Sequence, residues 1–267
     1  MMQDNIIDDF SRRHVRHRSR QATALVTNTE WKHWGTVDPL WGVAAWAGKE
    51  RGGFDAWTDA EFYALGKSDW SDFVKRWERY GLDKTSCVEI GCGAGRITAQ
   101  LINDFGTVHA LDVSEGMLTY AKARIDKAKF YLTDGVRIPL GDSSATAAFS
   151  CHVFQHFDSP EASISVFGEL HRVLVCGSTM MIHLPFYNWP LSRGLFERLF
   201  RIRQWLSRRK AAVDRMRGVP MMRGTWYEMG WLRQMLGEVG FVDIEFLSFS
   251  VSSNQSLHPF VLARKSS

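Results

Sequence analysis

From residue 85 onward, short apolar runs alternate with amphipathic segments of helical period. Apolar runs of strand length separated by such helices are typical of a parallel sheet covered by helices on both faces. No helix separates the last two strands, which predicts a hairpin or an antiparallel edge strand at the close. Strands are expected at 85–90, 107–111, 128–132, 145–151, 178–184, 241–249 and 259–264. Helices are expected at 95–104, 115–125, 160–174 and 226–238. The pattern predicts a doubly wound, mostly parallel α/β sheet of seven strands.

The first 80 residues have a different pattern. The stretch from Trp31 to Trp77 holds seven of the eleven tryptophans, which no solvated tail would carry. Thr58 and Glu61 have the spacing of a capping box and predict the start of a helix there. A second helix is expected to follow and to end at Gly81. We therefore predict an N-terminal tail and Trp-rich helical cap over 1–80, and a core over 81–267.

A second capping box is expected at the other end of the core. Thr225 and Glu228 have the same spacing as the first pair, and they precede the predicted helix 226–238. Between the fifth strand and this helix lie residues 185–225, far more than the two to six of a usual connection.

The long connection is also basic. Residues 193–223 carry ten Lys and Arg against two acids, whereas the whole chain has a net charge of +4. An apolar stripe opposite the arginines predicts a basic helix over 193–210. Three interpretations stay open: a solvated helix over the active site, a lid that attracts an acidic acceptor, or an interfacial helix on anionic lipid.

Composition narrows the class of protein. A hydrophobic content of 45% and a charged content of 23% are ordinary for a soluble globular protein. No apolar run approaches the roughly 20 residues that span a bilayer, and the N-terminus has no apolar signal segment. The four cysteines form no C-x-x-C pair, so we expect reduced thiols, a cytoplasmic protein and no metal site.

The stretch 88–98, VEIGCGAGRIT, is the first candidate for a binding site. Gly91, Gly93 and Gly95 follow a predicted strand and open a predicted helix, which is where doubly wound folds bind anionic or polar cofactors. Asp112 ends the second strand 17 residues after Gly95, close to the spacing of a ribose-binding acid. Asp134 follows the third strand. Three features in register at successive strand ends predict a cofactor site.

The spacing of the glycines favours one cofactor over another. A dinucleotide would place its pyrophosphate at this turn, where Glu89, two residues before Gly91, would repel it. S-adenosylmethionine carries an ammonium group and a sulfonium instead, for which an acid is suited. The turn therefore favours S-adenosylmethionine.

Residues 85–184 resemble the class I S-adenosylmethionine-dependent methyltransferases. The resemblance rests on VEIGCGAGRIT, ALDVSEGMLTYAKA, TDGVRIPL, FSCHVFQHF and ELHRVLVCGSTMMIHL. Residues 31–40 and 61–66 also resemble the N-terminal caps of some bacterial members that act on small molecules. The resemblance implies S-adenosylmethionine as cofactor, and it is silent on the acceptor.

The resemblance also implies cofactor contacts. Asp112 would take the ribose hydroxyls, Asp134 the adenine amino group, and Phe154 would line the cavity near the sulfonium. Met117 would pack on the adenine, or it is an ordinary core residue instead. For Asp134 the alternative role is that of a turn residue. The full set implied is Glu89, Gly91, Cys92, Gly93, Gly95, Asp112, Val113, Met117, Asp134, Gly135 and Phe154.

A hydroxyl acceptor must lose a proton, and His156 is the candidate base because it lies just past the fourth strand. His152, within that strand, is expected to pack against a helix. Further candidates for acceptor contacts are His183, Arg223, Trp226 and Tyr227. No Asn/Asp-Pro-Pro-Tyr motif follows the fourth strand, which weakens a nucleic-acid amino-methyltransferase, and no Asp/Asn/His set there supports metal-assisted chemistry.

These observations predict a methyltransferase that acts on a hydroxyl of a small molecule, such as a natural product, a sugar or a lipid-like acceptor. Three alternatives remain. They are an N-methyltransferase of a small molecule, a nicotinamide oxidoreductase, and a non-catalytic module that docks on a membrane or a partner through 193–210.

Overall fold

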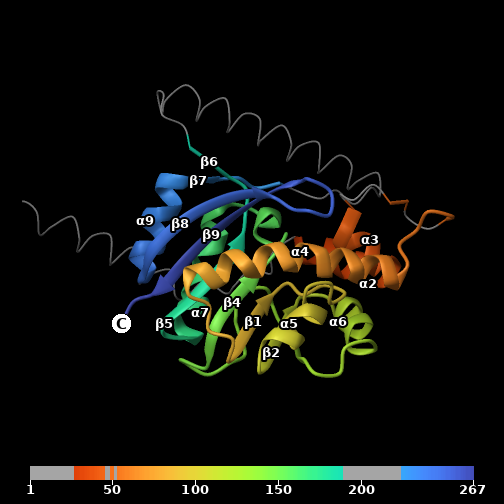
Figure 1. The fold of residues 1–267 in the computed structure, drawn as a ribbon, viewed down its shortest axis with the longest axis horizontal. Coiled ribbons are helices and arrows are strands. Elements are labelled where there is room, and N and C mark those ends of the chain that lie inside the picture. Colours follow the sequence, from red (N-terminus) through yellow and green to blue (C-terminus); the bar gives the residue numbers. More distant parts are fainter. Residues whose placement is uncertain (1–26, 46–48, 51–52, 189–223) are drawn as a thin grey trace, which may run out of the picture.

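The computed structural model describes residues 27–45, 49–50, 53–188 and 224–267. Its centre is a seven-stranded sheet in the order β3-β2-β1-β4-β5-β9-β8 (Figure 1). The first five strands in this order, from β3 through β2, β1 and β4 to β5, are parallel to one another. β9 is antiparallel to both of its neighbours. The strands are β1 Ser86–Ile90, β2 Thr107–Asp112, β3 Lys129–Leu132, β4 Ala145–Ser150, β5 Leu174–His183, β8 Phe241–Ser250 and β9 Leu257–Lys265. The predicted doubly wound, mostly parallel sheet is confirmed.

The closing hairpin differs from the expectation in one respect. Its antiparallel strand β9 lies inside the sheet between β5 and β8, and β8 forms the edge. Val261, Leu262 and Ala263 of β9 are buried. A continuous apolar run of this kind requires cover on both faces, which an edge strand would not have provided.

Two layers of helices cover the sheet. α7 and α9 share one core with one face, and α4 and α5 share another core with the opposite face. α6 packs beside β2 and β3. The helices are α2 Thr27–Val37, α3 Pro39–Ala44, α4 Asp59–Tyr80, α5 Thr98–Asp104, α6 Glu115–Lys122, α7 Ser163–Val173 and α9 Met229–Val239, with 3₁₀ turns η3 Phe154–His156 and η4 Pro160–Ala162. Two short strands, β6 Phe186–Tyr187 and β7 Tyr227–Glu228, pair beside the sheet. Among the described residues, no helix is long and apolar enough to cross a membrane.

α4 is one helix of 22 residues, where two helices were expected. The predicted capping box of Thr58 and Glu61 begins it, and Gly81 ends it with a φ of 101°. The helix continues through Gly66, where the chain approaches closely and glycine is required, since a Cβ there would overlap the carbonyl of Arg96. The second half of α4 buries Trp70, Phe73 and Trp77 against the sheet. The division of the chain into a cap and a core at residue 80 stays a prediction.

The second capping box is wrong. Glu228 is itself the N-cap of α9, and its carboxylate accepts hydrogen bonds from Gly230 N (2.9 Å) and Trp231 N (2.6 Å). Thr225 donates its hydroxyl to the carbonyl of Phe157 at 2.6 Å instead. The helix therefore begins at Met229, three residues later than expected.

The N-terminal helices form a third, smaller core above the glycine turn. Trp34, Leu40, Phe62 and Met117 are buried there together. α2 crosses α6 closely, since a Cβ on Gly35 would overlap Ser114 Oγ. The cap thus packs directly on the segment predicted to bind the cofactor.

A buried ion pair joins α4 to the glycine turn. Arg96 Nη1 donates to Asp69 Oδ2, and both side chains are almost fully buried. Asp69 Oδ1 also accepts the hydroxyl of Ser253 at 2.6 Å. The carboxylate of Asp69 therefore connects three segments that are distant in the sequence.

We predict that Asp69→Ala lowers the free energy of unfolding by about 3–5 kcal/mol, because it leaves a buried guanidinium without its counter-ion. Urea denaturation followed by circular dichroism measures this. Glu78 on the same helix forms an exposed pair with Lys84, and Glu78→Ala is the control, with an expected change of at most about 1 kcal/mol. Similar losses in both variants would show that the Arg96 pair has no special role.

Candidate functional site

A cavity of about 330 Å³ lies at the carboxyl ends of β1, β2 and β4. Open α/β sheets bind ligands at this edge because the loops there diverge. Its walls come from the glycine turn, the loop after β3, the turn η3 and the cap helices α2 and α3. The cavity therefore draws on every segment that the sequence singled out for the cofactor, and on the cap as well.

The first two glycines of the turn lie on the cavity wall. Gly91 and Gly93 have φ values of 70° and 54°, which glycine adopts at little cost. A Cβ at either position would also collide with Val153 or Val43, two residues that line the same cavity. Gly95 is not on the wall; a Cβ there would overlap Ile125, so its role is packing.

Asp112 is placed on the wall by the end of β2. Its Oδ2 accepts from Gly93 N at 2.8 Å and its Oδ1 from Ser114 N at 2.9 Å. Burial raises the pKa of this carboxyl to about 6, against the opposing effect of the backbone donors. Asp112 thus ties the glycine turn to the second strand and remains within reach of a ligand in the cavity.

Glu89 lies beneath the glycine turn and not on the cavity wall. Its side chain is buried, and Oε2 accepts the hydroxyl of Thr98 at 2.6 Å. Burial raises the pKa of Glu89 to about 7, while Thr98 and the charge of Arg96 act in the opposite direction. Cys92 also lies under the turn, where it packs with Ala110 and Leu118. Both residues support the turn from below.

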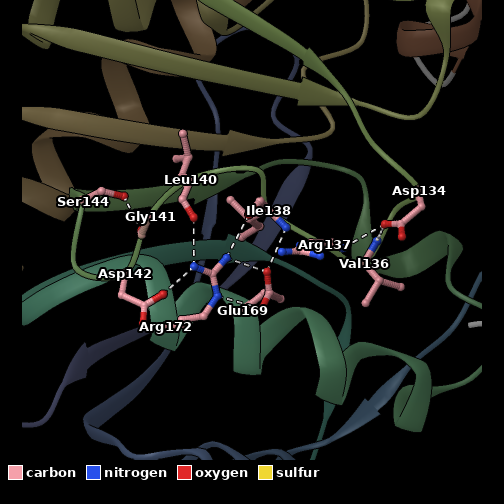
Figure 2. A network of polar contacts seen from close by, with 10 residues as sticks. All are labelled: Asp134, Val136, Arg137, Ile138, Leu140, Gly141, Asp142, Ser144, Glu169 and Arg172. Atoms are coloured by element: carbon pink, nitrogen blue, oxygen red, sulfur yellow. Dashed lines mark hydrogen bonds and ion pairs between the residues drawn. The ribbon is translucent and has the colours of Figure 1, made fainter. Parts of the chain in front are cut away.

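The loop after β3 contributes Gly135 to the wall, but not the side chain of Asp134. Asp134 is exposed, and its Oδ1 accepts from Val136 N and Arg137 N, both at 2.8 Å (Figure 2). These hydrogen bonds fit the alternative interpretation as a turn residue. The carbonyl of Asp134 accepts the amide of Asn28 at 2.9 Å, which joins α2 to this loop.

Arg172 on α7 fastens the same loop to the body of the protein (Figure 2). Its guanidinium donates to the carbonyls of Ile138 and Leu140, each at 2.8 Å, and pairs with Glu169. Glu169 in turn accepts from Ile138 N at 3.0 Å. No sequence motif indicated this clamp, because Arg172 is distant in the sequence from the loop that it holds.

The turn η3 after β4 supplies the other half of the wall. Val153, Gln155, His156 and Phe157 line the cavity. The neighbouring Phe154 does not, contrary to its predicted role. Its side chain is fully buried against Phe157 and Phe167 because the 3₁₀ turn directs it into the core.

His156 has a defined environment on this wall. Its side chain is 8% exposed and packs against Trp31 of α2, with ring centroids 4.8 Å apart. Gln155 Nε2 lies 3.1 Å from His156 Nε2. An amide nitrogen can only donate, so in this contact the imidazole Nε2 accepts. Gln155 and Trp31 together hold the ring of the predicted base in place.

The predicted acceptor residues lie elsewhere. His183 is buried and off the cavity wall, and Tyr227 is buried with its hydroxyl on the carbonyl of Phe154 at 2.9 Å. Trp226 is 47% exposed and also off the wall. Arg223 and the predicted basic helix 193–210 lie outside the described residues. Gly224, at the end of the long connection, does line the cavity.

The sequence analysis missed the contribution of the cap. Asn28, Trp31, Gly42 and Val43 line the cavity together with the predicted Val113 and Met117. The resemblance of 31–40 to N-terminal caps was the available signal, although it assigned no residue there to the site.

The comparisons with known proteins agree with this architecture. The fold, with β9 inserted antiparallel between β5 and β8, is similar to that of solved S-adenosylmethionine-dependent methyltransferases. Residues 88–182 match the family described as "Methyltransferase domain", and the chain carries that domain. The cofactor of this class is S-adenosylmethionine.

Individual relatives are similar to parts of the chain. A biotin biosynthesis bifunctional protein from Teredinibacter turnerae is 29% identical over 103 residues, which are 34% of this chain and 18% of that protein. A SAM-dependent methyltransferase from Methanosarcina mazei has a TM-score of 0.54 at 17% identity, covering 71% of this chain and 97% of its own. Phosphoethanolamine N-methyltransferase 2 of Haemonchus contortus, solved with phosphomonomethylethanolamine and S-adenosylhomocysteine, has a TM-score of 0.52 at 18% identity, covering 74% and 53%. These structures share the fold.

Glu89→Gln should raise the melting temperature of the cofactor-free protein more at pH 8 than at pH 5. The pKa of Glu89 is about 7 in the folded protein, above the ordinary value near 4.3. Ionisation therefore opposes folding, with no effect below about pH 4 and its full effect above about pH 7. Glutamine does not titrate, so it escapes this loss. Differential scanning calorimetry at both pH values measures the difference.

Glu61→Gln is the control for this experiment. The hydrogen bond from Lys49 lowers the pKa of Glu61 to about 2, so this group stays ionised from pH 5 to pH 8. Its effect on the melting temperature should not change over that interval. A Glu89→Gln effect that is equally flat would contradict the burial of an ionised carboxyl.

Asp112→Ala should weaken the affinity for S-adenosylhomocysteine by about 1.5–3 kcal/mol, the range for losing a hydrogen bond to a charged group. In the wild-type protein, affinity should fall as the pH drops below about 6, because the protonated carboxyl accepts hydrogen bonds less well. Titration calorimetry between pH 5 and pH 8 measures both effects. Asp126→Ala, on an exposed residue outside the cavity, should leave affinity unchanged. Equal affinity of the two variants would remove Asp112 from the cofactor site.

Proposed function

We propose that this protein transfers a methyl group from S-adenosylmethionine to a hydroxyl of a small molecule, with His156 as the general base. One observation carries the proposal: His156 shares a single cavity with Gly91, Gly93 and Asp112. A proton acceptor and the predicted cofactor residues therefore face the same enclosed space.

The residues of the cavity fit the cofactor. Gly91 and Gly93 let the backbone form the wall itself, and Asp112 offers a buried carboxylate at the end of β2. Gly135, Val113 and Met117 provide an apolar surface for a flat ring. When bound, S-adenosylmethionine supplies a methyl group on a positively charged sulfur. In this proposal Asp112 holds the ribose, and the glycine turn holds the amino-acid part.

His156 supports proton transfer by its position and its lone pair. Its Nε2 would take the proton of an acceptor hydroxyl once that hydroxyl displaces the Gln155 amide from the lone pair. Trp31 packs on the imidazole and excludes water from one side. Alignment and exclusion of water are the main demands of methyl transfer from a sulfonium.

The cavity has the size of a small-molecule site, and in this proposal the cofactor and the acceptor share it. About 330 Å³ lies near the lower end of the range for small-molecule sites. Gly224, the residue that follows the basic segment 193–223 in the sequence, lies on the cavity wall. An acidic or lipid-like acceptor therefore remains part of the proposal. Docking on a membrane or partner through 193–210 stays a prediction, and so does a cytoplasmic location.

Methyl transfer to nitrogen is the second candidate. The Haemonchus contortus neighbour is named an N-methyltransferase, and the same base could deprotonate an amine. A nicotinamide oxidoreductase is less favoured because the usual dinucleotide sheet is mostly parallel with the strand order 3-2-1-4-5-6, whereas here β9 is inserted antiparallel between β5 and β8. A screen of small alcohols, phenols and amines, with release of S-adenosylhomocysteine as readout, distinguishes oxygen from nitrogen acceptors.

His156→Ala should reduce turnover on an acceptor from this screen by roughly 10²–10⁴-fold, the usual contribution of general base catalysis. Affinity for S-adenosylhomocysteine should change little, because the cofactor residues come from other strand ends. Part of the lost rate should return at high pH, where an acceptor hydroxyl ionises unaided. Steady-state kinetics across pH and calorimetry measure these effects.

His156→Gln keeps polarity and approximate size but removes the basic nitrogen, so it should be as slow as the alanine variant. His109→Gln, at a partly buried histidine stacked on Tyr131 outside the cavity, should retain turnover. Near-normal turnover of His156→Gln would mean that the residue positions the acceptor and takes no proton.

A further inference from the structure

Three histidines that are distant in the sequence converge beside the cavity. His152 follows β4, His183 ends β5 and His258 lies near the start of β9. Because β9 runs antiparallel to β5, its start lies at the same edge of the sheet as the end of β5. The ligand atoms of the three imidazoles all lie within 4.8 Å of one another. The topology of the sheet therefore builds a compact cluster of nitrogen ligands.

The hydrogen bond of His258 fixes which nitrogen faces the cluster. Its Nδ1 lies 3.2 Å from the carbonyl of Ser256, which can only accept, so Nδ1 carries the proton. The lone pair is then on Nε2, which accepts a hydrogen bond from His152 Nε2 at 3.2 Å, and a metal ion would take the place of the shared proton. A histidine that donates one ring N–H to a carbonyl and directs the other nitrogen at a shared centre is typical of a metal ligand.

Burial makes solvent an unsuitable partner for these rings. His183 and His258 are 3% and 1% exposed. Within the part of the chain that the structure describes, His183 Nδ1 has no hydrogen-bond partner. Buried polar groups normally have one. The ring of Phe260, which packs against His183, offers no polar partner. A metal ion held by the cluster would be a partner for the imidazole nitrogen.

The spacing is compatible with a tetrahedral ion. Two imidazole nitrogens at 2.0–2.1 Å from a zinc-like ion lie roughly 3.3 Å apart, and His152 and His258 are already at 3.2 Å. His152 has a φ of 60°, a conformation that costs a non-glycine residue of order 1 kcal/mol or more and recurs at functional sites. That conformation directs a histidine from the end of β4 toward the other two.

The charges around the cluster allow a cation. Arg96 is the nearby positive group, and its charge is offset by the buried ion pair with Asp69.

We propose that His152, His183 and His258 form a binding site for one divalent transition-metal ion of the zinc type. Three histidines leave a fourth position open, as in catalytic zinc sites. His152 lines the cavity, so this position would face it, and an oxygen bound there would lose its proton more readily. Metal binding itself does not depend on the proposed function. The role in activating an acceptor does rest on it.

Titration of the full-length, chelator-treated protein with Co²⁺ tests the site. We expect one equivalent to bind with the visible absorption of a four- or five-coordinate ion, and Zn²⁺ to displace it. Zn²⁺ should also raise the melting temperature. His152→Gln, His183→Gln and His258→Gln should each weaken binding by more than about 100-fold, beyond the effect of losing an outer partner. These measurements need no turnover, so they stand apart from any failure of the methyltransferase assay.

His109→Gln is the matched control and should bind Co²⁺ as the wild type does. Circular dichroism confirms that each variant is folded. The proposal is overturned if the wild-type protein shows no saturable binding, a result that needs no variant. It is also overturned if folded His152→Gln and His258→Gln bind as tightly as the control, which would place the ion elsewhere on the chain.

Discussion

The buried charge of Arg96 is the constraint on which the rest of the site depends. Arg96 directly follows the glycine turn, and its buried guanidinium forms an ion pair with Asp69 on α4. A buried cation is tolerated only with a well-placed counter-ion. The cap helix and the cofactor turn must therefore keep one relative position. The charge of Arg96 also reaches Glu89 below the turn and the histidines beside the cavity.

Parallel strand direction explains why the predicted cofactor residues and His156, the proposed base, share one cavity. β1, β2 and β4 end at the same edge of the sheet, and each is followed by a segment that lines the cavity. β9 enters this edge from the opposite direction and brings His258 to the end of β5. The cap helices α2 and α3 close the remaining side. Trp31 from the cap and His156 from η3 thus meet across a space that the sheet alone would leave open.

The sequence predicted those features that depend on local pattern or on a strand end. The seven strands belong to this group, and so does the place of Gly91, Gly93 and Asp112 on one cavity wall, while their contacts to the cofactor stay predictions. The sequence-based prediction failed where a short turn decides the direction of a side chain. Phe154 is buried in the core, whereas the next residue, Gln155, lies on the cavity wall. The prediction also failed where tertiary contacts decide. Residues distant in the sequence, such as Arg172 and the loop it holds, or the three histidines, leave no common signal in it.

Two buried carboxyls connect the electrostatics of the site to its choice of ligand. Asp112 and Glu89 have pKa values of about 6 and 7 because burial disfavours their charged forms. Near neutral pH the site therefore holds negative charge at a cost in stability. A ligand that carries positive charge would relieve this cost, whereas a pyrophosphate would add to it. The same burial that destabilises the carboxylates thus favours a sulfonium cofactor over a dinucleotide, and the glycine turn provides the space for it.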